Sequence, residues 1–198
     1  MPITAKICGL STPETLDAAI RGGASHVGFV FFPPSPRNLS RDRAAQLAAR
    51  VPGHVSRVGV FVDPDDEQLD SAIAAGSLHA LQIHNGTPAR IAAIRARTGL
   101  HLWAAVAVKS RADLAAAATF AGAALPGGMG VRFDWSLLQD FRHPLPWALS
   151  GGLDPLNVAE AVAITRAPMV DVSSGVESTP GIKDATKIAA FLDTVKQL

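Results

Sequence analysis

The sequence predicts an α/β protein that forms a single (β/α)₈ barrel, a TIM barrel, over residues 1–198. Short apolar segments alternate with longer segments of helical spacing, a pattern typical of a parallel sheet with helical crossovers. The apolar segments are hydrophobic throughout, as expected for strands covered on both faces. Their starts lie roughly 20–30 residues apart, the size of a minimal βα unit. A strand at the start and a helix at the end favour closure into a barrel.

Seven strands and seven helices can be placed in order along the chain. Thr12 is the expected N-cap of the first helix, with Pro13 at its first position. An open doubly wound sheet is the alternative, but the link after the first strand lacks the G-x-G-x-x-G spacing. The predicted strands are residues 3–8, 26–31, 56–61, 78–83, 101–106, 147–149 and 169–172, and the predicted helices are residues 13–20, 40–50, 65–75, 88–97, 111–121, 155–164 and 185–195.

Strand six is missing or shortened in this sequence. Residues 121–124 are Ala and Gly and run directly into Leu125-Pro126, and these residue types disfavour strand interiors. Three explanations remain open: these residues form a stunted strand, residues 131–133 replace it, or a segment is absent between Ala124 and Leu125. We favour the third, because losing a central strand would leave unpaired edges on its neighbours.

Composition excludes several classes of function. A net charge of +1 argues against electrostatic binding of nucleic acid. The chain has no apolar run of about 18 residues that could span a membrane, and no basic and apolar leader typical of secretion. A single cysteine excludes an internal disulfide. We therefore expect a cytoplasmic protein without nucleic-acid or membrane partners.

Cys8 ends the first predicted strand, and Lys6 shares its face. Barrel enzymes place their chemistry at the carboxyl ends of the strands, where a thiolate could act as a nucleophile or a general base. A small buried core residue is the alternative for Cys8. A buried Lys6 could instead form a Schiff base.

Several polar residues follow the other predicted strands. Arg37 lies on a loop stiffened by three prolines, where it could bind a carboxylate or phosphate or simply be solvated. Asp171 could hydrogen-bond a hydroxyl or amine of a ligand, or cap its own turn. Gln82 and His84 lie near the end of strand four and point the same way.

Three glycine-containing turns, residues 127–130, 150–153 and 173–175, form a candidate phosphate site. Glycine allows close backbone approach, and successive N–H groups create concavities that bind anions. Barrels often hold phosphate on the loops after strands seven and eight. The residues of interest in these turns are Gly128, Gly152, Ser174 and Gly175.

These motifs together closely resemble the phosphoribosylanthranilate isomerase family of tryptophan biosynthesis. The likeness extends almost from end to end and keeps one order, which makes it highly specific. It is carried by residues 6–9, 28–31, 35–37, 58–61, 81–84, 125–128, 133–135, 149–153 and 171–177.

The resemblance implies an eight-stranded βα barrel that is an intramolecular oxidoreductase, an aldose–ketose isomerase. The family converts N-(5-phosphoribosyl)anthranilate to 1-(o-carboxyphenylamino)-1-deoxyribulose 5-phosphate by an Amadori rearrangement, without metal or organic cofactor. By resemblance, Cys8 is the general base, Arg37 binds the anthranilate carboxylate and Asp171 orients the ribose or amine. Phosphate is bound by Ser174 and by the glycine loops, which contain Gly128, Gly152 and Gly175. The partner is a small-molecule substrate, and the protein is a monomer or a homodimer.

One departure from the family pattern concerns the general acid. In the family this residue is an aspartate at the end of strand six, ahead of the Leu-Pro-Gly-Gly segment, and here Ala123-Ala124 stands in its place. If that deletion is real, we expect impaired activity. Two alternatives follow: an inactive phosphate-binding barrel of the same family, or the related isomerase of histidine biosynthesis. The latter usually has an aspartate in place of Cys8.

Overall fold

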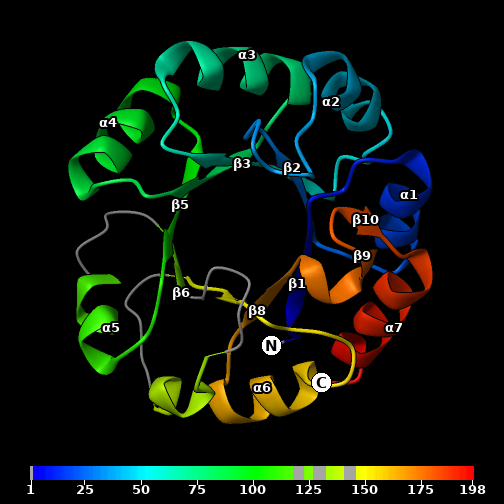
Figure 1. Ribbon diagram of the computed structural model, residues 1–198, viewed down its shortest axis with the longest axis vertical. Helices are drawn as coiled ribbons and strands as arrows, with labels where there is room; N and C mark the ends of the chain where they lie inside the picture. Colours follow the sequence, from blue (N-terminus) through cyan, green and yellow to red (C-terminus); the bar gives the residue numbers. More distant parts are fainter. Residues whose placement is uncertain (1, 118–122, 127–132, 141–145) are drawn as a thin grey trace.

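The computed structural model describes residues 2–117, 123–126, 133–140 and 146–198. Eight parallel strands form a ring with the helices outside it (Figure 1). The strands are β1 (Thr4–Cys8), β2 (His26–Val30), β3 (Ser56–Val62), β4 (Ala80–His84), β5 (His101–Val106), β6 (Ala123–Pro126), β7 (Leu149–Ser150) and β8 (Met169–Val172). The helices are α1 (Pro13–Arg21), α2 (Arg41–Ala48), α3 (Asp66–Gly76), α4 (Pro88–Thr98), α5 (Arg111–Ala117), α6 (Val158–Thr165) and α7 (Ala185–Lys196).

The strand order confirms the predicted barrel. Hydrogen-bonded pairing runs β6-β5-β4-β3-β2-β1-β8-β7. Strands β6 and β7 lie at the two ends of this order and come within 8 Å of each other between Cα atoms. Within the described residues the ring therefore closes by contact between β6 and β7, which are not joined by strand-to-strand hydrogen bonding.

Strand six is present but short, which agrees with the first of the three explanations, a stunted strand; the third, an absent segment between Ala124 and Leu125, stays a prediction. Ala123–Pro126 pairs in parallel with β5, from Trp103 opposite Ala123 to Val106 opposite Pro126. The partner strand overrides the weak strand preference of Ala and Pro. Pro126, which cannot donate a backbone hydrogen bond, stands at the last position of the strand. The alternative at residues 131–133 lies largely outside the described residues, because 131 and 132 are not described.

Helix caps account for most of the helix starts. The Oγ1 atom of Thr12 accepts a hydrogen bond from the N–H of Thr15 at 3.3 Å, which confirms the predicted cap. Asp154 accepts hydrogen bonds from the N–H groups of Leu156 and Asn157. These bonds hold a turn, so α6 begins at Val158, three residues after the predicted start.

The side chains inside and outside the ring form separate apolar clusters. Ile7, Phe29 and Leu81 belong to the large cluster that includes buried side chains of the outer helices. A second cluster inside the ring joins Val58, Ala80, Trp103 and Ala148, which come from segments around the ring. The third cluster contains Cys8, Val30 and Val60, which lie near the carboxyl ends of β1, β2 and β3. The sulfur atom thus lies on the inner face of the barrel.

A small hairpin follows β8 that sequence analysis did not predict. The 3₁₀ helix η2 (Ser174–Val176) leads into the antiparallel strands β9 (Glu177–Thr179) and β10 (Ile182–Lys183). In Figure 1 this segment lies between β1 and the outer helices α1 and α7. A second 3₁₀ helix, η1 (Trp135–Leu138), begins after Asp134, whose side chain accepts a hydrogen bond from the N–H of Ser136.

Candidate active site

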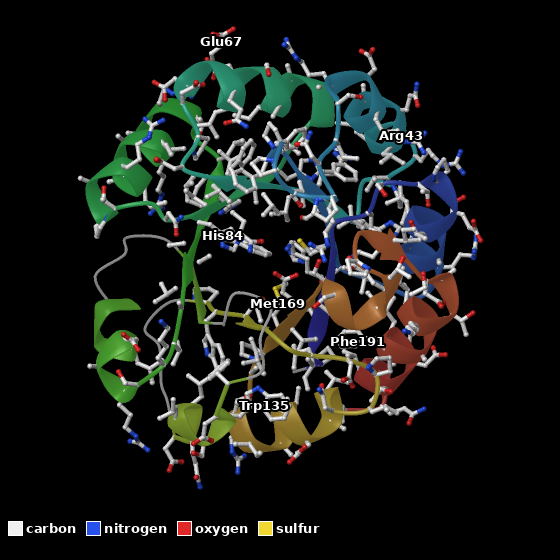
Figure 2. All side chains as sticks on the ribbon, in the orientation of Figure 1. Arg43, Glu67, His84, Trp135, Met169 and Phe191 are labelled. Atoms are coloured by element: carbon white, nitrogen blue, oxygen red, sulfur yellow. The ribbon has the colours of Figure 1, made fainter. Side chains whose placement is uncertain are left out.

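A cavity of about 260 Å³ opens at the carboxyl ends of the strands. Its wall contains Cys8, Arg37, Gly152, Asp171 and Ser174, so the barrel brings together five of the seven predicted site residues. Figure 2 shows His84 inside the ring of strands. The remaining wall residues are Val30, Phe32, Ser35, Val60, Val62, Gln82, His84, Ser150, Gly151, Leu153, Val172 and Ser173.

A buried ion pair forms the floor beneath Cys8. The Lys6 ammonium donates to both carboxylate oxygens of Asp171 at 2.9 Å and to Oε1 of Gln82 at 2.8 Å. Burial alone would lower the pKa of Lys6, but the negative charges of Asp171 and Cys8 outweigh it and raise the pKa above 10.5. Lys6 is therefore a bonded ammonium, which disfavours a Schiff base at this residue, because that step needs a free amine.

The thiol of Cys8 is held mainly in its protonated form. Burial raises its pKa above the ordinary value of 9.0, and the negative charge of Asp171 adds to the increase. The cations Lys6 and Lys183 act in the opposite direction. Lys6 lowers this pKa in sign, but desolvation by burial dominates.

Two histidines near the ion pair are neutral at pH 7. Burial, together with the positive charge of Lys6, lowers the pKa of His84 and lowers that of His26 to about 4. The Nε2 atom of His84 lies 3.2 Å from Nε2 of Gln82, so the amide that accepts from Lys6 also contacts this ring. Within the described residues, no group of three or more His, Cys, Asp or Glu side chains is arranged to hold a metal ion.

Arg37 lines the cavity, but it is also paired with another residue of the chain. Its Nε and Nη2 atoms donate to the two carboxylate oxygens of Glu177 at 2.6 and 2.8 Å. The hydrogen bonds and charge of Glu177 raise the pKa of Arg37. Two of its five N–H donors bind Glu177, which leaves three for a ligand, so the binding of an anion by Arg37 stays a prediction.

The glycine turns after β7 and β8 have the geometry of close backbone approach. Gly151 and Gly152 have φ of 103° and 66°, a region that favours glycine. A Cβ atom on Gly175 would lie 1.8 Å from the carbonyl oxygen of Leu153, so the two turns touch only because Gly175 lacks a side chain. Ser174 opens η2 beside them. The seventh predicted residue, Gly128, lies outside the described residues.

Comparison with known proteins shows the family. The sequence model of N-(5'-phosphoribosyl)anthranilate (PRA) isomerase matches residues 5–194. The chain belongs to this family. The N-(5'-phosphoribosyl)anthranilate isomerase of Zymomonas mobilis subsp. mobilis is 50% identical over 212 positions, which cover 100% of both chains.

Solved structures agree with this family membership. The phosphoribosyl anthranilate isomerase from Thermotoga maritima aligns with a TM-score of 0.90 at 34% identity, covering 99% of this chain and 100% of that one. A second structure of a phosphoribosyl anthranilate isomerase, in complex with reduced 1-(o-carboxyphenylamino)-1-deoxyribulose 5-phosphate, aligns with a TM-score of 0.87 at 35% identity. It covers 99% of this chain and 100% of that chain.

Part of the Zymomonas relative has no counterpart in this chain, and the sequence around strand six contains no acidic residue. The Zymomonas alignment has 212 positions for 198 residues, so about 14 positions of that relative have no counterpart here. Between Leu114 and Phe133 the sequence contains no Asp or Glu. No carboxylate therefore stands ahead of the Leu-Pro-Gly-Gly segment, where the resemblance places the general acid.

Sequence reasoning missed the roles of two residues at the hairpin. Glu177 entered the analysis only as the end of the motif at residues 171–177, and Lys183 not at all, yet both are buried and bonded beside the cavity. Gly181, between them, was a signal for a tight turn. The sequence did not reveal which loop that turn would contact, because the contact joins segments 140 residues apart.

Proposed function

We propose that this chain catalyses the Amadori rearrangement of N-(5-phosphoribosyl)anthranilate, an aldose–ketose isomerisation in tryptophan biosynthesis. One observation supports it most: Cys8 and the glycine turns after β7 and β8 line the same cavity at the carboxyl ends of the strands. In this proposal residues 1–198 form one barrel domain that acts in the cytoplasm, as a monomer or homodimer, on a small-molecule substrate.

The proposed binding mode places the reacting sugar between two anchored anionic groups. The free N–H groups of Arg37 bind the anthranilate carboxylate, and Ser174 with the turns at Gly152 and Gly175 binds the phosphate, with Gly128 as a further expected donor. Fixing both ends converts proton transfer into an intramolecular step. Asp171, held by Lys6, orients the ribose or amine at the cavity floor.

The proposed chemistry consists of ring opening followed by proton transfer from C2 to C1. Protonation of the ribose ring oxygen opens the ring to a Schiff base between C1 and the anthranilate nitrogen. Cys8, as thiolate, then removes the proton from C2, and the resulting enol takes up a proton at C1 and loses the proton of its C2 hydroxyl to give the ketone. The cationic Schiff base assists this step, because a positive charge near the thiol favours the thiolate.

Ring opening is the step for which this chain lacks the family's acid. Solvent must then supply the proton, so we expect kcat lower by about 10²–10⁴, the usual contribution of a positioned acid. An inactive phosphate-binding barrel is the second candidate function, and the missing carboxylate between Leu114 and Phe133 favours it.

The deciding experiment measures conversion of N-(5-phosphoribosyl)anthranilate by the purified chain, by Cys8→Ala and by the Zymomonas relative under the same conditions. Turnover that is slower than the relative's and lost in Cys8→Ala supports the isomerase. Binding of the reduced product analogue without turnover supports the inactive barrel. Turnover that survives in Cys8→Ala overturns the assignment of the base.

A further inference from the structure

Glu177 is the most heavily bonded carboxylate beside the cavity, and the proposed chemistry gives it no role. Its side chain is 4% exposed. It accepts from Arg37 at 2.6 and 2.8 Å, from the Lys183 ammonium at 2.6 Å and from the Gly181 N–H at 3.1 Å. These bonds lower its pKa to about 2, despite burial. A carboxylate so engaged is ionised and has little capacity left to contact a ligand.

The two hydrogen bonds that Arg37 donates to Glu177 fix both the position and the plane of its guanidinium group. Paired N–H bonds to one carboxylate hold the guanidinium plane as well as its position. Gly9 packs against the same side chain, since a Cβ atom there would lie 2.6 Å from Cδ of Arg37. The guanidinium is thus set by β9 and by the turn after β1, and its remaining N–H groups are available at the cavity wall.

Lys183 connects the same carboxylate to the strand that carries Cys8. Its ammonium donates to the carbonyl oxygen of Ser173 at 2.8 Å and lies 3.1 Å from Oγ of Ser173. That hydroxyl donates to the carbonyl oxygen of Cys8 at 3.3 Å. Lys183 is 1% exposed, so its charge is poorly screened by solvent.

We propose that Glu177 is a positioning residue, which aims Arg37 at the anionic end of the substrate and, through Lys183, sets the electrostatic field at Cys8. The part concerning Arg37 rests on the proposed function. The part concerning Cys8 rests on the described contacts alone and can be tested without turnover.

The sign of the electrostatic effect follows from the charges around the sulfur. Lys6 from β1, Lys183 from β10 and Arg37 from the loop after β2 favour the thiolate, and Asp171 from β8 opposes it. The apolar neighbours from β2 and β3 add only desolvation. Glu177→Gln removes the negative charge that offsets Lys183, so the pKa of Cys8 should fall. Lys183→Met removes a cation, so that pKa should rise.

The test uses the pH dependence of Cys8 alkylation by iodoacetamide, which reports one site because the chain has one cysteine. We expect the midpoint to move down in Glu177→Gln and up in Lys183→Met, each by at least about half a unit. Glu67→Gln is the matched control, because Glu67 is exposed on the outer rim (Figure 2), and it should leave the midpoint unchanged. Equal midpoints in all four proteins would overturn the electrostatic role.

Kinetics test the positioning of Arg37. In Glu177→Gln we expect KM to rise by roughly tenfold with kcat within about threefold, because Arg37 binds substrate and transition state alike. Glu177→Asp keeps the charge and should retain the wild-type alkylation midpoint, which also covers the case in which Glu177→Gln does not fold. An unchanged KM in a folded Glu177→Gln would overturn the positioning role. If the wild-type chain shows no turnover while the alkylation midpoints of the variants shift as expected, the proposed function is refuted and the electrostatic role of Glu177 stands.

Discussion

The ammonium group of Lys6 lies 2.9 Å from both carboxylate oxygens of Asp171, and neither side chain reaches solvent appreciably. The two residues belong to paired strands, with Lys6 opposite Asp171 in the register of β1 and β8. The pair therefore depends on the barrel register and supports the floor of the cavity below Cys8.

Replacement of Asp171 by Asn should destabilise the fold strongly. The variant leaves the Lys6 ammonium buried without a counter-charge, and loss of one partner of a buried pair typically costs about 3–5 kcal/mol. Urea denaturation measures the change. Asp70→Asn is the control, because the Asp70–Arg97 pair is largely exposed and should contribute little. Similar losses in the two variants would contradict this account.

The stability contributed by Cys8 should decrease at alkaline pH. Burial raises the pKa of the folded-state thiol above 9.0, so the folded protein binds the proton more tightly than the unfolded chain. That contribution is complete below the ordinary thiol pKa and is lost as the pH rises through the folded-state value. Denaturation of wild type and Cys8→Ala at several pH values measures the difference. A difference that stays constant to pH 10 would disprove the raised pKa.

The contribution of Glu177 should be lost in acid. Its folded-state pKa is lowered from 4.5 to about 2 by its hydrogen bonds to Arg37, Lys183 and Gly181, which outweigh burial. The ionised Glu177 carboxylate therefore adds stability above pH 4.5, and this contribution disappears as the pH falls toward 2. The melting temperatures of wild type and Glu177→Gln should converge across that window. Parallel curves would argue against an ionised Glu177.

Gly175→Ala should disturb the turn after β8, which we propose to bind the phosphate. The new methyl group would lie 1.8 Å from the carbonyl oxygen of Leu153, so the turns after β7 and β8 must separate. We expect weaker binding of inorganic phosphate by at least about tenfold and a loss of stability of about 1–3 kcal/mol, as for overpacking. Gly53→Ala is the control, because nothing lies within 4 Å of its Cβ position. Calorimetry and denaturation measure both effects, and a neutral Gly175→Ala would contradict the proposed contact.

Local pattern was sufficient for most of the barrel. Strand β1 and helix α1 could be placed from an apolar run, a threonine cap and a proline, because these act within a few residues. Strand β6 could not be placed, because Ala123–Pro126 becomes a strand only through its pairing with β5. The hairpin at Glu177 was also missed, since its two strands are only three and two residues long.

The sequence alone determined the barrel class, the family resemblance and five residues that meet in one cavity, because strand periodicity sends the carboxyl ends of parallel strands to one rim. Tertiary structure decided the charge state and bonding of those residues. Lys6 is an ammonium because Asp171 lies opposite it, and Arg37 is paired because Glu177 reaches it from β9. These contacts depend on through-space distance, which spacing along the chain does not encode.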